Sequence, residues 1–344
     1  MIMYLRYIMY FIMGIIAFGV LIIVHELGHF ILAKLNGVRV EEFSIGMGPK
    51  ILSKQTKETK YSLGILPIGG YVKMMGEEEN VADERSFSSK SPLKRISIII
   101  AGVFMNYVLA ILIFTFYIHT HGYVTTIPVA VMPDSPAYEA GLLVGDKILK
   151  VNDLTAFSYD NVSAGIALSY GNPINMSVDR NGEKKDITVT PIKNEDGRLQ
   201  IGLTFSAVEK PALGESLKQS FKQTESLVSQ TFKGLEMIFT GKANLKTDVG
   251  GPVTIIKMST KTAEAGIWPL LYFTGFLSVN LAVFNLLPFP ALDGGWCVIL
   301  LIELITRRKV PDKIVAVLNY IGFAALIGLM LLVTIKDIIF PIKF

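Results

Sequence analysis

The sequence predicts a polytopic α-helical membrane protein with about four transmembrane helices, a β-hairpin between the first two, and one small α/β domain outside the membrane. Composition is the first observation: 51% of the residues are hydrophobic and 18% are charged, and the mean hydropathy is +0.47. A soluble domain is less apolar. The net charge is only +4, and no basic stripe interleaves with aromatic residues, so we expect no nucleic-acid partner.

Four long apolar runs are the second observation. Each is long enough for a helix across the lipid bilayer, which needs about 20 residues. They cover residues 7–32, 96–118, 268–289 and 314–335. The loop between the first two carries basic residues from Lys34 to Arg95, and the loop between the last two carries Arg307, Arg308, Lys309 and Lys313. The positive-inside rule therefore places both loops in the cytoplasm and both chain ends outside.

The first cytoplasmic loop contains an apolar segment that predicts a β-hairpin over residues 61–75. Apolar and small residues alternate there around Gly69 and Gly70, which Tyr71 follows. Its edge could pair with an extended substrate, so these three residues are candidate substrate contacts. The alternative is a hairpin buried for structural reasons.

Residues 119–208 predict the small outside domain. The stretch "SPAYEAGLLVGDKILKVND" reads as a capped short helix followed by a strand, with Ser135 as the cap and Gly141 as the stop. Residues 174–192 predict two strands joined at Asn181-Gly182. These features resemble a bacterial PDZ domain. Such domains add an extended peptide to a sheet edge, and the alternative is a domain that only spaces or gates.

Residues 209–266 are expected to form an amphipathic linker region between that domain and the last two spans, which occupy residues 267–344. Its segment 213–239 has apolar residues at roughly helical spacing. The helix could lie on the membrane surface or pack against the outside domain.

The first apolar run contains His25-Glu26-Leu27-Gly28-His29. Residues four apart share one face of a helix, so both imidazoles can reach one metal ion. Glu26 beside them can act as a general base, as in other proteins with this spacing. Ionisable side chains inside a membrane are costly, and by default they mark function.

Two histidines leave a catalytic zinc one protein ligand short. Asp293 is the best candidate, because it follows Pro288 and Pro290 in an apolar context and precedes Gly294-Gly295. The alternative for Asp293 is a helix cap. His119 and His121 lie at the outer end of the second run, remote from such a site. Cys297 is expected to be a small buried residue.

The pair of motifs, His25-Glu26-Leu27-Gly28-His29 and the run from Asn285 through Pro288 and Pro290 to Leu292-Asp293-Gly294, resembles the site-2 protease family of intramembrane zinc metalloproteases. The order of spans, cytoplasmic hairpin and outside domain is similar to the regulator-of-sigma-E protease branch, over nearly the whole chain. Some members of that branch carry two PDZ domains, whereas residues 119–266 have room and signals for one.

The resemblance implies Zn²⁺ held by His25, His29 and Asp293, with Glu26 as general base. It also implies a substrate-positioning role for Asn285, for which Asn280 and Asn106 are the alternatives. The implied substrates are single-span membrane proteins, such as anti-sigma factors or signal-peptide remnants, trimmed beforehand by a site-1-type protease. The implied location is the bacterial cytoplasmic membrane, with the site toward the cytoplasm.

Two other classes compete with a protease. A transporter would explain the polar groups and helix breakers at membrane depth, but no inverted repeat is visible. A membrane-tethered PDZ scaffold would explain the outside domain and leave His25, Glu26, His29 and Asp293 without a purpose. Metal content separates both classes from a zinc protease.

Overall fold

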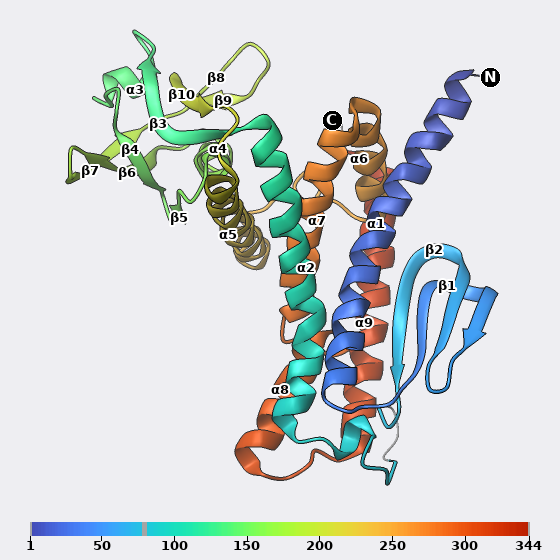
Figure 1. The fold of residues 1–344 in the computed structure, drawn as a ribbon. Coiled ribbons are helices and arrows are strands. Elements are labelled where there is room, and N and C mark those ends of the chain that lie inside the picture. The colour runs from blue at the N-terminus through green and yellow to red at the C-terminus, as the bar shows by residue number, and fades with distance from the viewer. Residues whose placement is uncertain (1, 78–80, 343–344) are drawn as a thin grey trace. The chain divides into compact units, whose positions relative to one another are not determined.

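The structure is a computed structural model that describes residues 2–77 and 81–342. The chain divides into two compact units (Figure 1). One contains residues 1–110 and 244–344, and the other contains residues 111–243. We refer to them as the membrane unit and the β-rich unit, and α2 (Pro92–His121) runs from the first into the second.

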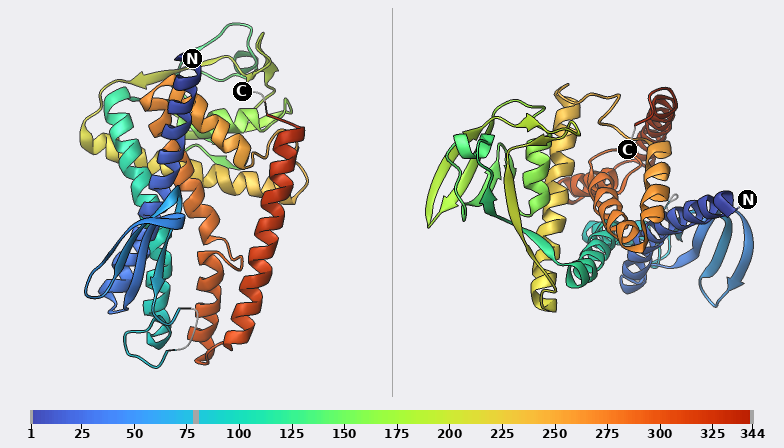
Figure 2. Two further views of the ribbon diagram at one scale, coloured as in Figure 1. Left: turned by 90° about the vertical axis from the view of Figure 1, so that its right-hand side faces the viewer. Right: turned by 90° about the horizontal axis from the view of Figure 1, so that it is seen from above.

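The long helices of the membrane unit follow the apolar runs. They are α1 (Ile2–Leu35), α2, α7 (Ile267–Leu286) and α9 (Asp312–Ile339), and each is long and apolar enough to cross a membrane. Figures 1 and 2 show the axes of α1, α7 and α9 roughly parallel, with the chain running in α9 opposite to its direction in α1 and α7. Only 6% of the most apolar window of α9 is buried inside the protein. So much apolar surface needs a hydrocarbon environment, and the described residues contain four candidate spans at the places of the predicted apolar runs.

Shorter helices complete the membrane unit. They are the 3₁₀ turn η1 (Phe87–Ser89), α6 (Pro252–Ala265) and α8 (Asp293–Thr306). Helix α7 ends at Leu286, three residues before the end of the predicted run, because Pro288 forces its predecessor out of the helical region. Helix α8 begins directly at Asp293.

The loop between the first two apolar runs forms a β-sheet, but the predicted pairing was wrong. We expected residues 61–75 to fold on themselves as a hairpin. They form one bent strand instead, β2 (Lys60–Met74), which pairs with β1 (Val40–Gln55). Ile45 of β1 lies opposite both Leu63 and Gly70, so the first part of β1 runs between the two halves of β2, while residues 50–55 pair with the first half of β2 alone. The pairing could not be predicted from residues 61–75 alone, because the partner strand β1 lies upstream of them.

The sheet packs against α1 over a buried apolar cluster (Figure 1). The cluster joins residues of α1, the loop after it, β1, β2, η1, α2 and α8: Ala33, Val38, Val40, Phe43, Val72, Met74, Phe87, Ile98, Ile99, Cys297 and Leu300. Cys297 is 8% exposed, as expected of a small apolar side chain. Beside it, Arg95 of α2 donates to Glu303 of α8 at 2.7 Å, and both side chains are buried. This packing holds the start of α2 and the body of α8 in place around the end of α1.

The β-rich unit is built from short strands and helices. Its main antiparallel sheet has the order β5-β4-β6-β7, and β10 pairs with β3. The elements are β3 (Tyr123–Val131), α3 (Pro136–Glu139), β4 (Lys147–Val151), β5 (Leu154–Thr155), α4 (Tyr159–Ala167), β6 (Ile174–Arg180), β7 (Glu183–Val189), β8 (Ile192–Lys193), β9 (Leu199–Gln200), β10 (Leu203–Val208) and α5 (Leu213–Phe239).

Local sequence signals explain this unit well. The hairpin β6–β7 turns at Asn181 and Gly182, which both adopt positive φ (55° and 89°) as that turn requires. Ser135 caps α3 by accepting from the Tyr138 backbone N–H at 3.3 Å. Ile174, Met176 and Val178 alternate into the core. The predicted cap and hairpin are confirmed.

Helix α5 spans the predicted residues, and the alternative of packing against the β-rich unit is the one observed. Ser226 contacts α4: its hydroxyl meets that of Ser158 at 2.9 Å, and its carbonyl accepts from Asn161 at 3.3 Å. The buried side of α5 is rich in small polar residues such as Ser220 and Ser226. Phe221 and Phe232 of the same helix are about half exposed.

Candidate metal centre and active site

Helix α1 brings His25 and His29 onto one face. The two side chains are separated by one helical turn, and their rings meet edge to face. Both are buried, at 7% and 8% exposed, in a stretch of α1 whose other residues, apart from Glu26, are apolar or glycine. Their Nε2 atoms lie 3.2 Å apart.

The turn between α7 and α8 delivers Asp293 to the same point. Gly294 and Gly295 allow this turn, because a Cβ on either would come within 2.2–2.3 Å of a backbone carbonyl oxygen of the preceding loop. Asp293 Oδ2 then lies 3.2 Å from Nε2 of His25 and 3.6 Å from Nε2 of His29. Three side chains that are far apart in sequence thus converge on one small volume.

The donor set fits a zinc ion. Ligand atoms of a tetrahedral zinc site with bonds of about 2.0–2.1 Å lie about 3.3 Å apart, and the three distances here are 3.2, 3.2 and 3.6 Å. Asp293 Oδ2 is buried, and it has no hydrogen-bond partner among the residues that the structure describes. A buried carboxylate oxygen without a partner is costly, and a bound cation removes that cost.

Helix α2 lies close enough to orient the histidines. The Nδ1 atom of His29 is 2.9 Å from the Ile98 carbonyl oxygen, to which it donates, so its Nε2 is free to act as a ligand. Gly102 makes this approach possible, because a Cβ there would lie 2.5 Å from Nε2 of His29 and 2.7 Å from Cε1 of His25. Gly28 of α1 has the same effect, because a Cβ there would lie 2.3 Å from the backbone carbonyl oxygen of Ala101 in α2.

Glu26 points to the side of α1 that meets the β-sheet. Its carboxylate lies close to Val72 of β2. Gly70 lies beside it, since a Cβ on this glycine would be 3.5 Å from Cγ of Glu26. Gly69 packs against Met47, and Tyr71 lies under the Lys50 ammonium group at 4.6 Å. The predicted substrate contacts on β2 therefore lie next to the predicted general base.

The three asparagines considered from the sequence have different surroundings. Asn285 is half-buried, with Nδ2 3.5 Å from Nε2 of His25, at the edge of the candidate metal centre. Asn280 donates to the Phe276 carbonyl of its own helix at 2.9 Å. Asn106 is fully buried, and its amide meets Nδ1 of His25 at 3.2 Å. The position of Asn106 inside an apolar run signalled a special role, but its partner was not predictable.

His119 and His121 have other contacts. Nδ1 of His119 is 3.0 Å from the Pro211 carbonyl oxygen, and the ring of His121 stacks on Tyr117. Neither belongs to the group formed by His25, His29 and Asp293.

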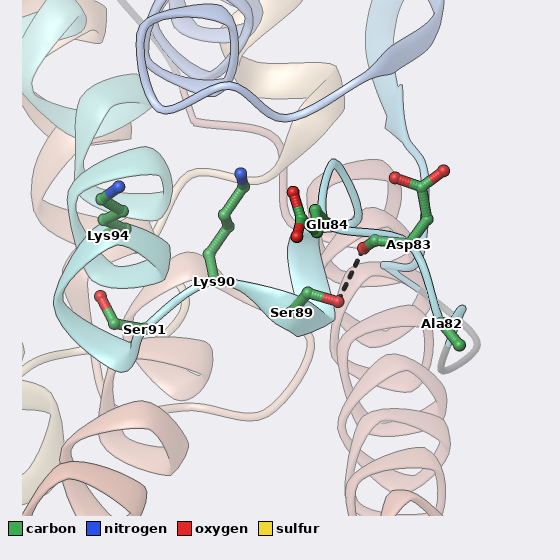
Figure 3. Close-up of a pocket in the computed structure, with 7 residues that line it drawn as sticks. All are labelled: Ala82, Asp83, Glu84, Ser89, Lys90, Ser91 and Lys94. Atoms are coloured by element: carbon green, nitrogen blue, oxygen red, sulfur yellow. Dashed lines mark hydrogen bonds between the residues drawn. The ribbon is translucent and has the colours of Figure 1, made fainter.

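A cavity of about 830 Å³ lies beside the sheet in the membrane unit. Its lining runs from Tyr71 and Val72 of β2 to Trp296 of α8 and to Lys309 and Val315. Tyr71, Val72 and Lys73 on its wall directly follow Gly70, which lies beside Glu26. A second, shallower pocket between Asp83 and Lys94 contains none of the candidate site residues (Figure 3).

Comparison with known proteins agrees with this geometry. Residues 13–329 match the model of peptidase family M50. A protein of Clostridium perfringens that is named as a zinc metalloprotease is 53% identical over 97% of this chain and 100% of its own. The zinc metalloprotease RasP of Geobacillus kaustophilus is 30% identical over 94% of this chain and 96% of its own. An Enterococcus faecalis protein named as the protease eep is also 30% identical, over 94% of this chain and 97% of its own.

A match over almost the whole chain excludes the transporter and scaffold alternatives. Together with the four membrane-length helices, it shows an integral membrane protein that uses zinc. The chain belongs to peptidase family M50 and is an intramembrane zinc metalloprotease of the site-2 type.

Proposed function

We propose that this protein cleaves transmembrane segments of single-span membrane proteins at a zinc held by His25, His29 and Asp293, with Glu26 as the general base. One observation carries the assignment of ligands: three donor atoms lie 3.2–3.6 Å apart, and one of them is a buried carboxylate oxygen with no hydrogen-bond partner in the described part of the chain.

The chemistry needs a proton acceptor beside the metal ligands. Zinc, when bound, supplies Lewis-acid polarisation of a carbonyl group and makes water a better nucleophile at neutral pH. Glu26 accepts the proton of the attacking water and delivers it to the leaving amide nitrogen as the peptide bond breaks. Glu26 is next in sequence to the proposed ligand His25 and lies against β2 at Gly70, so its carboxylate is held beside the metal site.

A transmembrane substrate must unwind locally before its peptide bond is accessible, and lipid cannot replace the lost hydrogen bonds. The part of β2 around Gly69, Gly70 and Tyr71 supplies a strand edge for that purpose, because it lies directly beside Glu26. Asn285 supplies a side-chain amide next to the metal ligands. An extended substrate bound between them would present its backbone to the site.

The proposed location is the bacterial cytoplasmic membrane, with the site toward the cytoplasm and both chain ends outside. Basic residues in the loop that carries β1 and β2 and in the loop after α8 support this orientation. Water would enter through the 830 Å³ cavity, whose lining includes Lys73, Lys309 and the β2 residues Tyr71 and Val72.

Residues 119–208 are proposed to be a single PDZ-like domain outside the membrane. The capped helix at Ser135 and the sheet order β5-β4-β6-β7 support this assignment. The domain would act as a size filter or bind peptide tails, so that substrates are first trimmed by a site-1-type protease. Anti-sigma factors and signal-peptide remnants fit this description. Residues 209–266 remain proposed as the linker region to the last two spans.

The test is cleavage of a single-span substrate by the purified protein in detergent. Wild type is compared with Glu26→Gln and with Glu139→Gln, an exposed control of the same chemistry, and zinc is measured in all three. We expect Glu26→Gln to keep zinc and to lose about 10²–10⁴-fold in cleavage rate, while Glu139→Gln behaves as wild type. A Glu26→Gln variant that cleaves at the wild-type rate would remove Glu26 from the mechanism.

A further inference from the structure

Asn106 of α2 is a fully buried amide in contact with one candidate ligand. Its side chain meets Nδ1 of His25 at 3.2 Å, on the opposite side of the ring from the metal site. The Oδ1 atom of Asn106 has no hydrogen-bond partner among the residues described. A buried amide oxygen left unpaired costs about 1–3 kcal/mol, so this arrangement calls for an explanation.

Ligation by His25 restricts which atom of the amide can face the ring. Nε2 of His25 is the atom that meets Asp293 and His29. A neutral imidazole that binds a metal through Nε2 carries its proton on Nδ1, and this N–H needs an acceptor. An amide nitrogen cannot accept a hydrogen bond, whereas an amide oxygen can. The two ends of the amide have nearly the same shape, so a half-turn about its last bond exchanges them.

We propose that Asn106 is a positioning residue for the metal centre: its amide oxygen accepts a hydrogen bond from Nδ1–H of His25 when zinc is bound. This contact selects the tautomer of His25 and fixes the plane of its ring. The proposal rests on the ligand set proposed above. Helix α2 then orients both histidines, since the Ile98 carbonyl does the same for His29.

The surroundings of Asn106 support positioning over substrate contact. Asn106 is 0% exposed, so it cannot reach a substrate without a rearrangement of the helices. Ser278 of α7 donates to the Asn106 backbone carbonyl at 2.8 Å and ties the two helices together at this residue. Asn285, by contrast, is half-buried on the metal side of His25 and stays the candidate for substrate contact.

The test measures zinc affinity by chelator competition, with full-length protein in detergent. Asn106→Leu keeps the shape and removes the acceptor, and Asn106→Asp keeps an acceptor. Ser278→Ala is the matched control, because it removes a buried hydrogen bond at the same place that does not involve His25. We expect Asn106→Leu to weaken zinc binding about 10–100-fold, as for other partners of metal-bound histidines. Asn106→Asp should bind zinc at least as tightly as wild type, and Ser278→Ala should resemble wild type.

The visible absorption spectrum of the cobalt-substituted protein gives a second readout. Asn106→Leu should change the band positions, because the ligand ring is no longer held, and Asn106→Asp should restore a band pattern close to that of wild type. Asn106→Ala replaces the leucine variant if the latter does not fold.

Equal zinc affinity in wild type and Asn106→Leu would overturn the proposal, as would an Asn106→Asp variant as weak as Asn106→Leu. A His25→Ala variant separates this from failure of the ligand set. If His25→Ala binds zinc as wild type does, the ligand set itself is wrong, and the role of Asn106 falls with it.

Discussion

Asp293 in the membrane unit and Asp146 in the β-rich unit are both carboxylates with little exposure, at 18% and 1% for the side chain. Asp146 is fully paired: Arg180 donates to both of its oxygens at 2.7 Å, and the Leu143 backbone N–H donates at 2.9 Å. Asp293 Oδ2 faces two imidazole nitrogens, and among the residues that the structure describes it has no hydrogen-bond donor.

Hydrogen-bond partners therefore separate a structural carboxylate from a metal ligand. A buried carboxylate persists when its lone pairs are satisfied, and Asp146 satisfies them with protein donors. Asp293 leaves an oxygen free at the position where a cation fits, and its burial makes sense only with that cation present. The same contrast holds for Asp337 in the membrane unit, which caps α6 by accepting from the Gly251 and Thr254 backbone N–H groups.

The largest effect is expected when Asp293 is made neutral, which tests whether this carboxylate is a metal ligand. We expect Asp293→Asn to weaken zinc binding by more than the roughly 100-fold seen when an outer partner is lost, because a direct ligand is replaced. Without zinc, the variant should be as stable as wild type or more so, since an unpaired buried charge is removed. Zinc titration and thermal unfolding of the metal-free protein check both parts. A large loss of stability in the metal-free variant would make Asp293 structural.

Two glycines at close contacts, one in each unit, separate loss of stability from loss of zinc binding. Gly102→Ala places a methyl group against the imidazoles of His25 and His29, whereas Gly165→Ala places one 2.6 Å from Cγ1 of Val151 in the β-rich unit. Both should destabilise the protein by about 1–3 kcal/mol through overpacking. Only Gly102→Ala should also weaken zinc binding, which chelator competition measures. If the two variants bind zinc equally well, contact of α2 with the histidines is not needed for the site.

Asp146→Asn is the converse of the change at Asp293. It leaves the Arg180 guanidinium without its carboxylate partner, and we expect it to destabilise the β-rich unit by about 3 kcal/mol. This value is the lower end for breaking a buried pair, because the Arg180 side chain is 22% exposed. Zinc content should not change. The measurement is thermal unfolding followed by circular dichroism, with zinc determined in parallel. Loss of zinc from this variant would contradict the separate roles of the two carboxylates.

The smallest expected effect is on pH dependence. Burial alone would raise the pKa of Asp146, but the hydrogen bonds from Arg180 and Leu143 hold this pKa below its usual value. Because the unfolded-state pKa is about 3.9, the pair contributes its full stability above about pH 4 and loses it as pH falls toward the folded-state pKa. The difference in melting temperature between wild type and Asp146→Asn should therefore shrink between pH 5 and pH 3. A difference that stays constant over this range would contradict the assignment.

Much of the fold was predictable because its signals are local. The spans follow from apolar length, and the β6–β7 hairpin follows from Asn181-Gly182. The clustering of His25, His29 and Asp293 was predictable in part. Helical spacing brings the histidines together, while the position of Asp293 came from its cost in an apolar context and from family resemblance.

What could not be predicted depends on contacts between distant segments. The sheet beside α1 uses β1 as the partner of both halves of β2, and nothing within residues 61–75 indicates that partner. The packing side of α5 depends on hydroxyl and amide contacts to α4, such as Ser226 with Ser158, in place of apolar periodicity. The contacts of Ile98 and Asn106 with the histidines depend on how closely α2 approaches α1. Gly28 and Gly102 permit this approach, but glycines in an apolar run do not by themselves predict it.

The most direct test of the central claim is X-ray absorption at the zinc edge of the purified, zinc-loaded protein. We expect two imidazole ligands with the remaining ligands oxygen, all at about 2.0–2.1 Å. The imidazole contribution should fall to one in His29→Ala. A sulfur ligand at about 2.3 Å would point to Cys297 instead of Asp293, and it would contradict the metal centre described above.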